Sequence, residues 1–213
     1  MQQNRWENEL KQGLRTAEDL CNAGFIDHRE LPAYERVLSR YRFLVTPYYA
    51  DLIDKSNPRC PIRAQAIPSL QEEAQTWKAD PLGDLQHQPA PRVTHRYHNR
   101  ALLHLAPNCS MYCRYCFRKS LLNDLRDDFF VGELTAAFTY LKNTPAIAEV
   151  ILSGGDPFMV SDSQLANVTK EIAGIPHVKK LRVHTRVPVT LPSRITDTLI
   201  HSLSNYGKAL LIV

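Results

Sequence analysis

The sequence predicts an α/β protein, namely the first four strands of a βα barrel preceded by a helical amino-terminal extension. Two observations support this prediction. Residues 1–92 combine helical periodicity with scattered prolines, whereas from Arg100 onward short apolar segments alternate with amphipathic ones. Such alternation is typical of parallel strands joined by crossover helices. We therefore divide the chain into an extension with its linker, 1–92, and the amino-terminal part of a barrel, 93–213.

The extension is expected to be mainly helical. Apolar residues recur with a period near 3.6 over residues 6–22 and again over 31–43. Prolines interrupt any long element within residues 46–66. The segment from Ser69 to Glu72 has the spacing of a capping box, so a short helix is expected to begin there.

The partial barrel is expected to contain parallel strands with helices between them. The expected strands are 101–106, 149–153, 180–184 and 209–213, and the expected helices are 132–142, 161–174 and 193–205. A last strand without a covering helix would leave a bare sheet edge, so we expect the chain to be part of a longer protein. The alternative is that this strand pairs within an oligomer, and a homo-oligomer is compatible with the sequence.

The composition argues against a polyanion or a membrane as partner. Lysine and arginine number 26 against 22 acidic residues, a net charge of +4, and the basic residues are scattered. Nucleic-acid-binding segments usually concentrate such residues in blocks. No apolar run approaches the roughly 20 residues that span a bilayer, and the first residues lack the apolar stretch of a signal peptide. We therefore expect a cytoplasmic protein without nucleic-acid or membrane partners.

Three of the five cysteines, Cys109, Cys113 and Cys116, follow the first expected strand within eight residues. This crowding suits a metal site in a reducing compartment better than a disulfide framework. A four-iron cluster normally needs four thiolates, so three would leave one iron open to a small molecule. The alternative is a zinc site whose fourth ligand is one of three histidines, His95, His98 or His104.

The other two cysteines stand alone in the sequence. Cys21 falls on the apolar face of its expected helix and is predicted to be a small buried hydrophobic residue. Cys60 lies between two prolines and is predicted to be an incidental loop thiol. Neither is expected to bind the metal.

The pattern Cys109-x3-Cys113-x-Tyr115-Cys116 after a strand resembles the radical S-adenosylmethionine (SAM) superfamily, whose fold is a TIM-like barrel. This resemblance implies a 4Fe-4S cluster whose open iron binds the amino and carboxylate groups of SAM. Electron transfer from the cluster then generates a 5′-deoxyadenosyl radical. Tyr115 would lie on the adenine side of SAM, and packing under the cluster loop is the alternative.

A second motif strengthens this resemblance. The turn Gly154-Gly155-Asp156, at the end of the next expected strand, resembles the Gly-Gly-acidic motif that meets the methionyl amino group of SAM in the superfamily. Glycine would let the ligand approach the backbone. Taken alone the turn is a weak signal, because such residues suit many strand-to-helix loops.

Three flanking segments narrow the resemblance to the lysine 2,3-aminomutase family, and within it to the shorter branch that makes (R)-β-lysine for elongation factor P. These segments are 94–101, 113–118 and 181–196. The resemblance implies an isomerase that moves the amino group of L-lysine from the α to the β carbon. It also implies pyridoxal 5′-phosphate (PLP) as a cofactor and an electron donor such as flavodoxin or ferredoxin.

Two alternatives stay open for this function. One is an aminomutase that acts on glutamate or another amino acid. The other is a non-catalytic iron–sulfur or zinc module.

The resemblance assigns individual residues to the PLP and substrate sites. Arg96, Tyr97 and Arg100 match positions beside PLP, where two arginines could hold the phosphate. The alternative for Arg100 is that it simply ends a strand in solvent. Arg118 matches the arginine that meets the substrate carboxylate, and a solvated arginine would look the same.

Two further residues are assigned to the SAM site. His184 and Arg186 end the third expected strand and would face SAM. A structural hydrogen bond is the alternative role for His184.

The lysine that holds PLP as an imine in the family lies beyond the matching segment. No lysine of this chain suits that role: Lys119 is beside the cluster loop, and Lys179 and Lys180 stand at the wrong end of a strand. The carboxylates that bind the side-chain amine of the substrate are likewise beyond the segment. We therefore expect this chain alone to be unable to close the barrel or anchor PLP.

Overall fold

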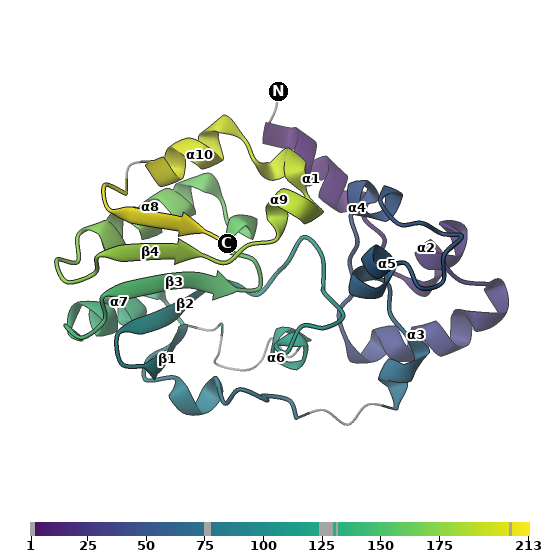
Figure 1. The fold of residues 1–213 in the computed structure, drawn as a ribbon, viewed down its shortest axis with the longest axis horizontal. Coiled ribbons are helices and arrows are strands. Elements are labelled where there is room, and N and C mark those ends of the chain that lie inside the picture. Colours follow the sequence, from purple (N-terminus) through teal and green to yellow (C-terminus); the bar gives the residue numbers. More distant parts are fainter. Residues whose placement is uncertain (1–2, 75–77, 124–129, 131, 205) are drawn as a thin grey trace.

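The structure is a computed structural model that describes residues 3–213 except 75–77, 124–129, 131 and 205. Its five strands form one open sheet in the order β1-β2-β3-β4-β5 (Figure 1). The strands are β1 (Val93–Tyr97), β2 (Arg100–Ala106), β3 (Glu149–Gly154), β4 (Lys180–Val183) and β5 (Ala209–Ile212). Strands β2 to β5 are parallel, which confirms the predicted α/β class and the partial barrel.

Strand β1 is an addition to the four predicted strands. It pairs with β2 in the antiparallel sense, with Val93 opposite Leu103 and Tyr97 opposite Arg100. Only its first two residues are buried, because the strand lies at the edge of the sheet and its later side chains are exposed. An edge strand with this polar sequence lacks the apolar alternation that identified the others.

The sheet has two chemically different faces. Leu103, Leu152 and Leu181 belong to the main hydrophobic core, together with buried residues of α7 (Leu134–Lys142), α8 (Asp162–Ala173) and α10 (Asp197–Ser204). Their sequence neighbours Leu102, Ile151 and Arg182 pair with one another across the strands and line a cavity instead. Because side chains alternate along a strand, one face packs on helices and the other remains available for a site.

The helices after β3 match the prediction with two differences. Ser161 caps α8 by accepting a hydrogen bond from the Gln164 backbone N–H, at the residue where the predicted helix begins. The helix predicted over 193–205 is shorter, because a 3₁₀ turn (Pro192–Arg194) precedes α10, and residue 205 lies outside the described residues. A short helix α9 (Val187–Thr190) follows β4 and was not predicted.

The extension contains α1 (Gln3–Lys11), α2 (Ala17–Asn22), α3 (Leu31–Arg40), α4 (Pro47–Asp51) and α5 (Pro61–Ala66). The single helix predicted over 6–22 is wrong. Leu14 forms a β-bridge with Val45, and a Cβ on Gly13 would lie 2.6 Å from Leu44, so the chain turns there to meet another segment. Likewise α3 stops at Arg40, and Phe43 is buried outside the helix.

Short 3₁₀ turns complete the chain: η1 (His28–Glu30), η2 (Leu70–Glu73), η3 (Leu85–His87) and η4 (Pro157–Met159). The capping box at Ser69 and Glu72 is confirmed, on η2. None of the described helices is both long enough and apolar enough to cross a membrane.

The extension has a hydrophobic core of its own, built from α2 to α5 and the segments between them. Met111 inserts into this core from the loop after β2, and Cys113 packs against it. Cys21 is partly buried there, and Cys60, which was predicted to be an incidental loop thiol, is fully buried. In Figure 1 helices α2 to α5 and the sheet lie on opposite sides of the loop that leads to α6 (Lys119–Asn123). The division at residues 92 and 93 stays a prediction.

Long-range hydrogen bonds join the extension to the part of the chain that follows β4. The Thr46 hydroxyl donates to the Thr190 carbonyl at 2.5 Å, and the hydroxyls of Thr190 and Ser110 lie 2.6 Å apart. Ser193 donates to the Glu9 carboxylate at 2.5 Å. These contacts hold the extension against the end of the sheet where β2, β3 and β4 finish.

Candidate functional site

All three cysteines of the motif lie on the loop between β2 and α6. Their side chains line one cavity of about 30 Å³. As they stand, no three Cys, His, Asp or Glu side chains in the described part of the chain converge into a ready metal site. Three thiols on one short loop are nevertheless the donor set that an iron–sulfur cluster uses. The loop therefore has the right chemistry, and its thiols would have to draw together around a cluster.

The histidines considered as a fourth zinc ligand point to other partners. His95 Nδ1 lies 2.6 Å from the Tyr140 hydroxyl, and His104 Nε2 lies 2.9 Å from the Thr94 hydroxyl. Neither histidine, nor His98, is among the residues that line the cysteine cavity. This arrangement favours the iron–sulfur interpretation of the loop.

The protonation of the thiols is set by their surroundings. Burial raises the pKa of Cys109 well above its usual value, and the nearby Asp156 carboxylate acts in the same direction. Burial also raises the pKa of Cys116, although the Arg118 backbone N–H opposes this shift. Both thiols are therefore protonated at neutral pH without a metal, and cluster binding must release their protons.

The Gly154-Gly155-Asp156 turn packs directly against the start of the cysteine loop. The Gly155 N–H donates to the Ala106 carbonyl at 2.6 Å, and the Asp156 N–H donates to the Asn108 carbonyl at 2.8 Å. A Cβ on Gly155 would lie 2.4 Å from the Asn108 carbonyl oxygen. Glycine is thus required by the approach of two backbone segments, a structural reason that the sequence did not indicate.

The Asp156 carboxylate links two loops of the site through hydrogen bonds. It is almost fully buried and accepts hydrogen bonds from the Thr185 hydroxyl at 2.7 Å and from the backbone N–H groups of Arg186 and Phe158 at 2.8 and 3.0 Å. Burial raises its pKa, while these hydrogen bonds act in the opposite direction. The side chain therefore joins the loops after β3 and β4, and its predicted contact with SAM stays a prediction.

Arg186 connects this region to the cysteine loop. Its Nη1 donates to Cys113 Sγ at 3.0 Å, and its Nη2 donates to Gln65 Oε1 at 2.9 Å. The guanidinium lies 5.6 Å from the centre of the Tyr115 ring. Tyr115 is 64% exposed, so it does not pack under the loop. Arg186 and Tyr115, both predicted to face SAM, thus lie together beside Cys113.

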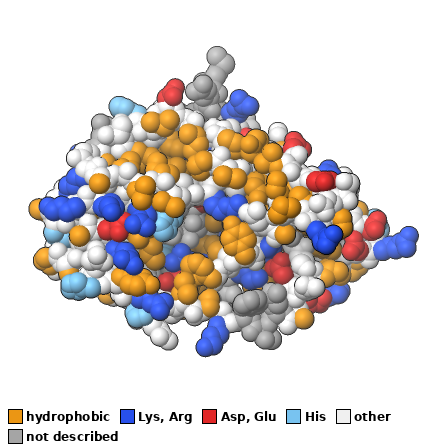
Figure 2. All heavy atoms as spheres, in the orientation of Figure 1, with side chains coloured by type: hydrophobic (Ala, Val, Ile, Leu, Met, Phe, Trp, Pro, Cys, Tyr) orange, Lys and Arg blue, Asp and Glu red, His pale blue; other side chains and the backbone are white. Residues whose placement is uncertain are grey.

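A second cavity, of about 430 Å³, lies on the free face of the sheet. It brings together all the residues predicted to bind PLP and the substrate carboxylate, Arg96, Tyr97, Arg100 and Arg118. Arg182 and His184 also line it, so His184 is placed here and not in the cysteine cavity, and its predicted contact with SAM stays a prediction. Figure 2 shows basic and hydrophobic side chains gathered around a hollow on this face. A basic pocket of this kind suits phosphate and carboxylate groups.

The arginines of this cavity each contact a partner within the protein, although Arg96 is exposed to solvent. Arg118 Nε donates to Asp84 Oδ2 at 2.7 Å, with the two side chains only 11% and 6% exposed, so the alternative of a solvated arginine is wrong. Arg100 stacks on the Tyr97 ring at 4.1 Å, and Arg96 donates to the Leu82 carbonyl at 3.0 Å. Asp84, a single acidic residue in the linker, carried no signal in the sequence that could have identified it.

Lys119 lies away from the predicted PLP site, and its unsuitability as the PLP lysine stays a prediction. Its ammonium lies 3.4 Å from Glu72 and 4.4 Å from the centre of the Tyr41 ring, on the side of the extension. Lys119 does not line the arginine-rich cavity.

We expect stability to fall as the pH drops from 7 to 5, because of His104. Burial lowers its pKa well below the usual value, and Arg118 and Arg92 act in the same direction. Below about pH 6.5 the unfolded chain takes up a proton that the folded chain excludes, so the free energy of unfolding falls with pH. Urea unfolding at several pH values should show that the free energy of unfolding changes less steeply with pH in His104→Gln than in the wild type. Equal slopes would contradict the expectation.

Comparison with known proteins agrees with this site. Residues 99–186 match a family described as a 4Fe-4S single cluster domain. The matched segment contains the cysteine loop, the Gly-Gly-Asp turn and Arg186. Fold and site together define the class: an iron–sulfur protein of the radical SAM type, built on part of a βα barrel.

Curated relatives give a more specific comparison. Three proteins named L-lysine 2,3-aminomutase are 39% identical (Fusobacterium nucleatum), 38% identical (Acetoanaerobium sticklandii) and 38% identical (Bacillus subtilis), each over 95% of this chain. The chain covers 48%, 50% and 44% of these relatives, about their amino-terminal half. Over nearly its whole length the chain is similar to these L-lysine 2,3-aminomutases, which confirms the resemblance to that family drawn from the sequence.

Proposed function

We propose that this chain provides the cofactor-binding half of a radical SAM aminomutase that converts L-lysine to β-lysine. The observation that carries the proposal is that two sites adjoin through the cysteine loop, one within the loop after β2 and one on the free face of the sheet. The cysteine loop supplies one site, and Arg118, two residues after Cys116, lines the arginine-rich cavity that would be the other. The resemblance of the chain to proteins named L-lysine 2,3-aminomutase supports the choice of substrate.

Cys109, Cys113 and Cys116 would hold the 4Fe-4S cluster. When bound, the cluster and SAM supply a carbon radical able to abstract hydrogen, and PLP supplies an electron-accepting ring. The chain's own contribution is positional. Arg186 and Tyr115 border the cluster loop beside Cys113, where they would orient SAM.

In the second cavity, different arginines would bind the phosphate of PLP and the carboxylate of the substrate. Arg96 and Arg100 would pair with the phosphate of PLP, beside the Tyr97 ring. Arg118 is oriented by Asp84 so that its remaining N–H groups can pair with the substrate carboxylate. Burial lowers the pKa of His184, and Arg182 and Arg118 act in the same direction, so its imidazole is neutral at pH 7 and adds no charge to the cavity.

The test uses the complete product of the gene that encodes this chain. After anaerobic reconstitution with iron and sulfide, reduction, and addition of SAM and PLP, L-lysine should yield β-lysine together with 5′-deoxyadenosine. L-Glutamate, tested in parallel, should yield no product. Failure to convert any α-amino acid would refute the proposal, and conversion of glutamate alone would identify a different aminomutase.

We further propose that the product is the (R) enantiomer, that it serves the modification of elongation factor P, and that flavodoxin or ferredoxin donates the electron. The segments 94–101, 113–118 and 181–196 support this finer proposal by their resemblance to that branch of the family. Deleting the gene should remove the β-lysyl mass from elongation factor P in the same cells. An unchanged mass would refute the role in that modification.

A non-catalytic metal module is the second candidate. The observation that keeps it in view is that the three cysteines line one cavity, because thiolates also bind zinc. Metal and sulfide analysis of the reconstituted protein separates the two candidates. Zinc without sulfide would support the module and contradict the aminomutase.

A further inference from the structure

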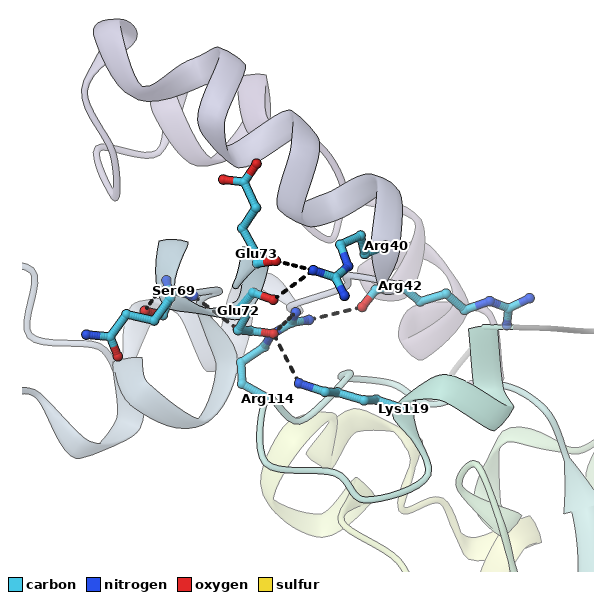
Figure 3. A network of polar contacts seen from close by, with 8 residues as sticks. Arg40, Arg42, Ser69, Glu72, Glu73, Arg114 and Lys119 are labelled. Atoms are coloured by element: carbon cyan, nitrogen blue, oxygen red, sulfur yellow. Dashed lines mark hydrogen bonds and ion pairs between the residues drawn. The ribbon is translucent and has the colours of Figure 1, made fainter. Parts of the chain in front are cut away.

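The middle of the cysteine loop is held by the amino-terminal extension. Arg114, between Cys113 and Tyr115, is only 9% exposed. Its Nε and Nη2 donate to the two carboxylate oxygens of Glu72 at 3.0 and 2.6 Å (Figure 3). Its Nη1 donates to the Arg42 carbonyl at 3.1 Å. The guanidinium is thus paired in the bidentate geometry that gives an arginine–carboxylate pair both strength and direction.

Glu72 is equally fixed on its own side. The Ser69 N–H donates to Oε1 at 3.1 Å, closing the capping box of η2. The Lys119 ammonium lies 3.4 Å from Oε2, so Glu72 contacts the chain both before and after Cys116 (Figure 3). With its side chain 6% exposed, this carboxylate is buried and has partners from three segments.

A second tie from the extension reaches Cys113 itself. The Arg114 N–H donates to the Gln65 carbonyl at 2.9 Å. The Gln65 side chain accepts from Arg186 Nη2, whose Nη1 donates to Cys113 Sγ. The segment from Cys113 to Cys116 is therefore held from α5 and from η2 at once.

Glu73, the next residue, differs from Glu72 in its exposure and in its partner. Glu73 pairs with Arg36, and these side chains are 41% and 59% exposed. The Glu73 backbone carbonyl accepts a hydrogen bond from Arg40, which belongs to the extension. Glu73 thus has the same charge and the same 3₁₀ turn as Glu72, but its ion pair stays within the extension.

We propose that Glu72 and Arg114 are positioning residues for the iron–sulfur cluster, through which the extension holds the backbone between Cys113 and Cys116 in place while the thiols turn toward the cluster. The inference rests on the proposed iron–sulfur function. A loop that is already ordered loses less conformational freedom when it binds its ligand, so it binds more tightly. A buried ion pair that loses one partner leaves an unpaired charge and forces the loop to rearrange. The pair therefore makes cluster retention depend on residues far from the cysteines in sequence.

The test compares Glu72→Gln with the matched control Glu73→Gln in the complete chain. After reconstitution, each protein is challenged with an iron chelator, and iron loss is followed over time. Glu72→Gln should lose iron on the order of tenfold faster than the wild type, consistent with breaking a buried pair. Its reduced cluster should also give an altered paramagnetic resonance spectrum. Glu73→Gln should match the wild type in both measurements, and Glu72→Asp, which keeps the charge, should be intermediate.

The double variant Glu72→Met/Arg114→Met separates positioning from general stability. Replacing a buried ion pair with apolar residues of similar size is often neutral for folding. We expect its thermal unfolding midpoint without the cluster to return toward that of the wild type, while iron loss stays fast. If cluster retention recovers together with stability, the pair is merely structural and the inference is wrong.

Failure of the inference is distinguishable from failure of the proposed function. Equal cluster retention in wild type and Glu72→Gln would refute the positioning role and leave the function intact. A wild-type chain that binds zinc without sulfide, or no metal, would refute the iron–sulfur function and the inference with it.

Discussion

Replacing Cys113 with alanine should abolish the iron–sulfur cluster. A cubane needs nearly its full set of thiolates, and two of the three on this loop cannot hold it securely. Iron and acid-labile sulfide per chain should fall to about a tenth of the wild-type values or less. Both are measured after anaerobic reconstitution, together with SAM cleavage under reducing conditions.

Cys21→Ala is the matched control for this experiment. Cys21 is also a partly buried free cysteine, but it lies on α2 in the core of the extension. It should leave the iron and sulfide contents unchanged. Full iron and sulfide in Cys113→Ala would refute the assignment of the cluster to this loop.

Replacing Gly155 with alanine should destabilise both the fold and the cluster loop. The new Cβ would lie 2.4, 2.8 and 2.9 Å from the carbonyl oxygen, carbonyl carbon and nitrogen of Asn108. These are backbone atoms that cannot rotate away, and Asn108 immediately precedes Cys109. We expect a loss of about 3 kcal/mol in the free energy of unfolding, measured by urea denaturation, as for other overpacked sites.

Gly174→Ala tests whether that loss comes from the contact with Asn108. Gly174 follows α8 with an ordinary φ of −71°, and the nearest atoms to an added Cβ lie at 3.5 and 3.7 Å. This variant should change stability by less than about 1 kcal/mol, in the stabilising direction. Similar losses in the free energy of unfolding for both variants would contradict the explanation by contact with Asn108.

The sequence predicted the elements whose pattern is local. Strands β2 to β5 and helices α7 and α8 have apolar periodicity and recognisable caps, so their positions could be assigned within a few residues. The break between α1 and α2 could not, because it depends on the pairing of Leu14 with Val45. Strand β1 was missed for a similar reason, since its identity as a strand comes from its partner β2 and not from its own composition.

The candidate site, like the fold, was predictable from the sequence only in part. The sequence predicted the cysteines from their type and spacing, and it predicted the arginines from the resemblance to the family. It did not identify the groups that hold them, Asp84 for Arg118, Thr185 for Asp156, and Glu72 and Gln65 for Arg114. These partners are separated from the residues they hold by 29 to 49 positions, and only the fold brings them together.

The order of the strands in the sheet is also their order along the chain. During synthesis, each parallel strand can therefore pair with its predecessor as soon as it emerges, without waiting for later sequence. The contacts of Thr46 with Thr190 and of Glu9 with Ser193 join residues 144 and 184 positions apart, so they must form late. The extension, although made first, reaches its final place only after β4 exists. The cysteine loop likewise gains its contacts with Arg186 and Thr190 only at that stage, so part of its support comes from one of the last segments to be made.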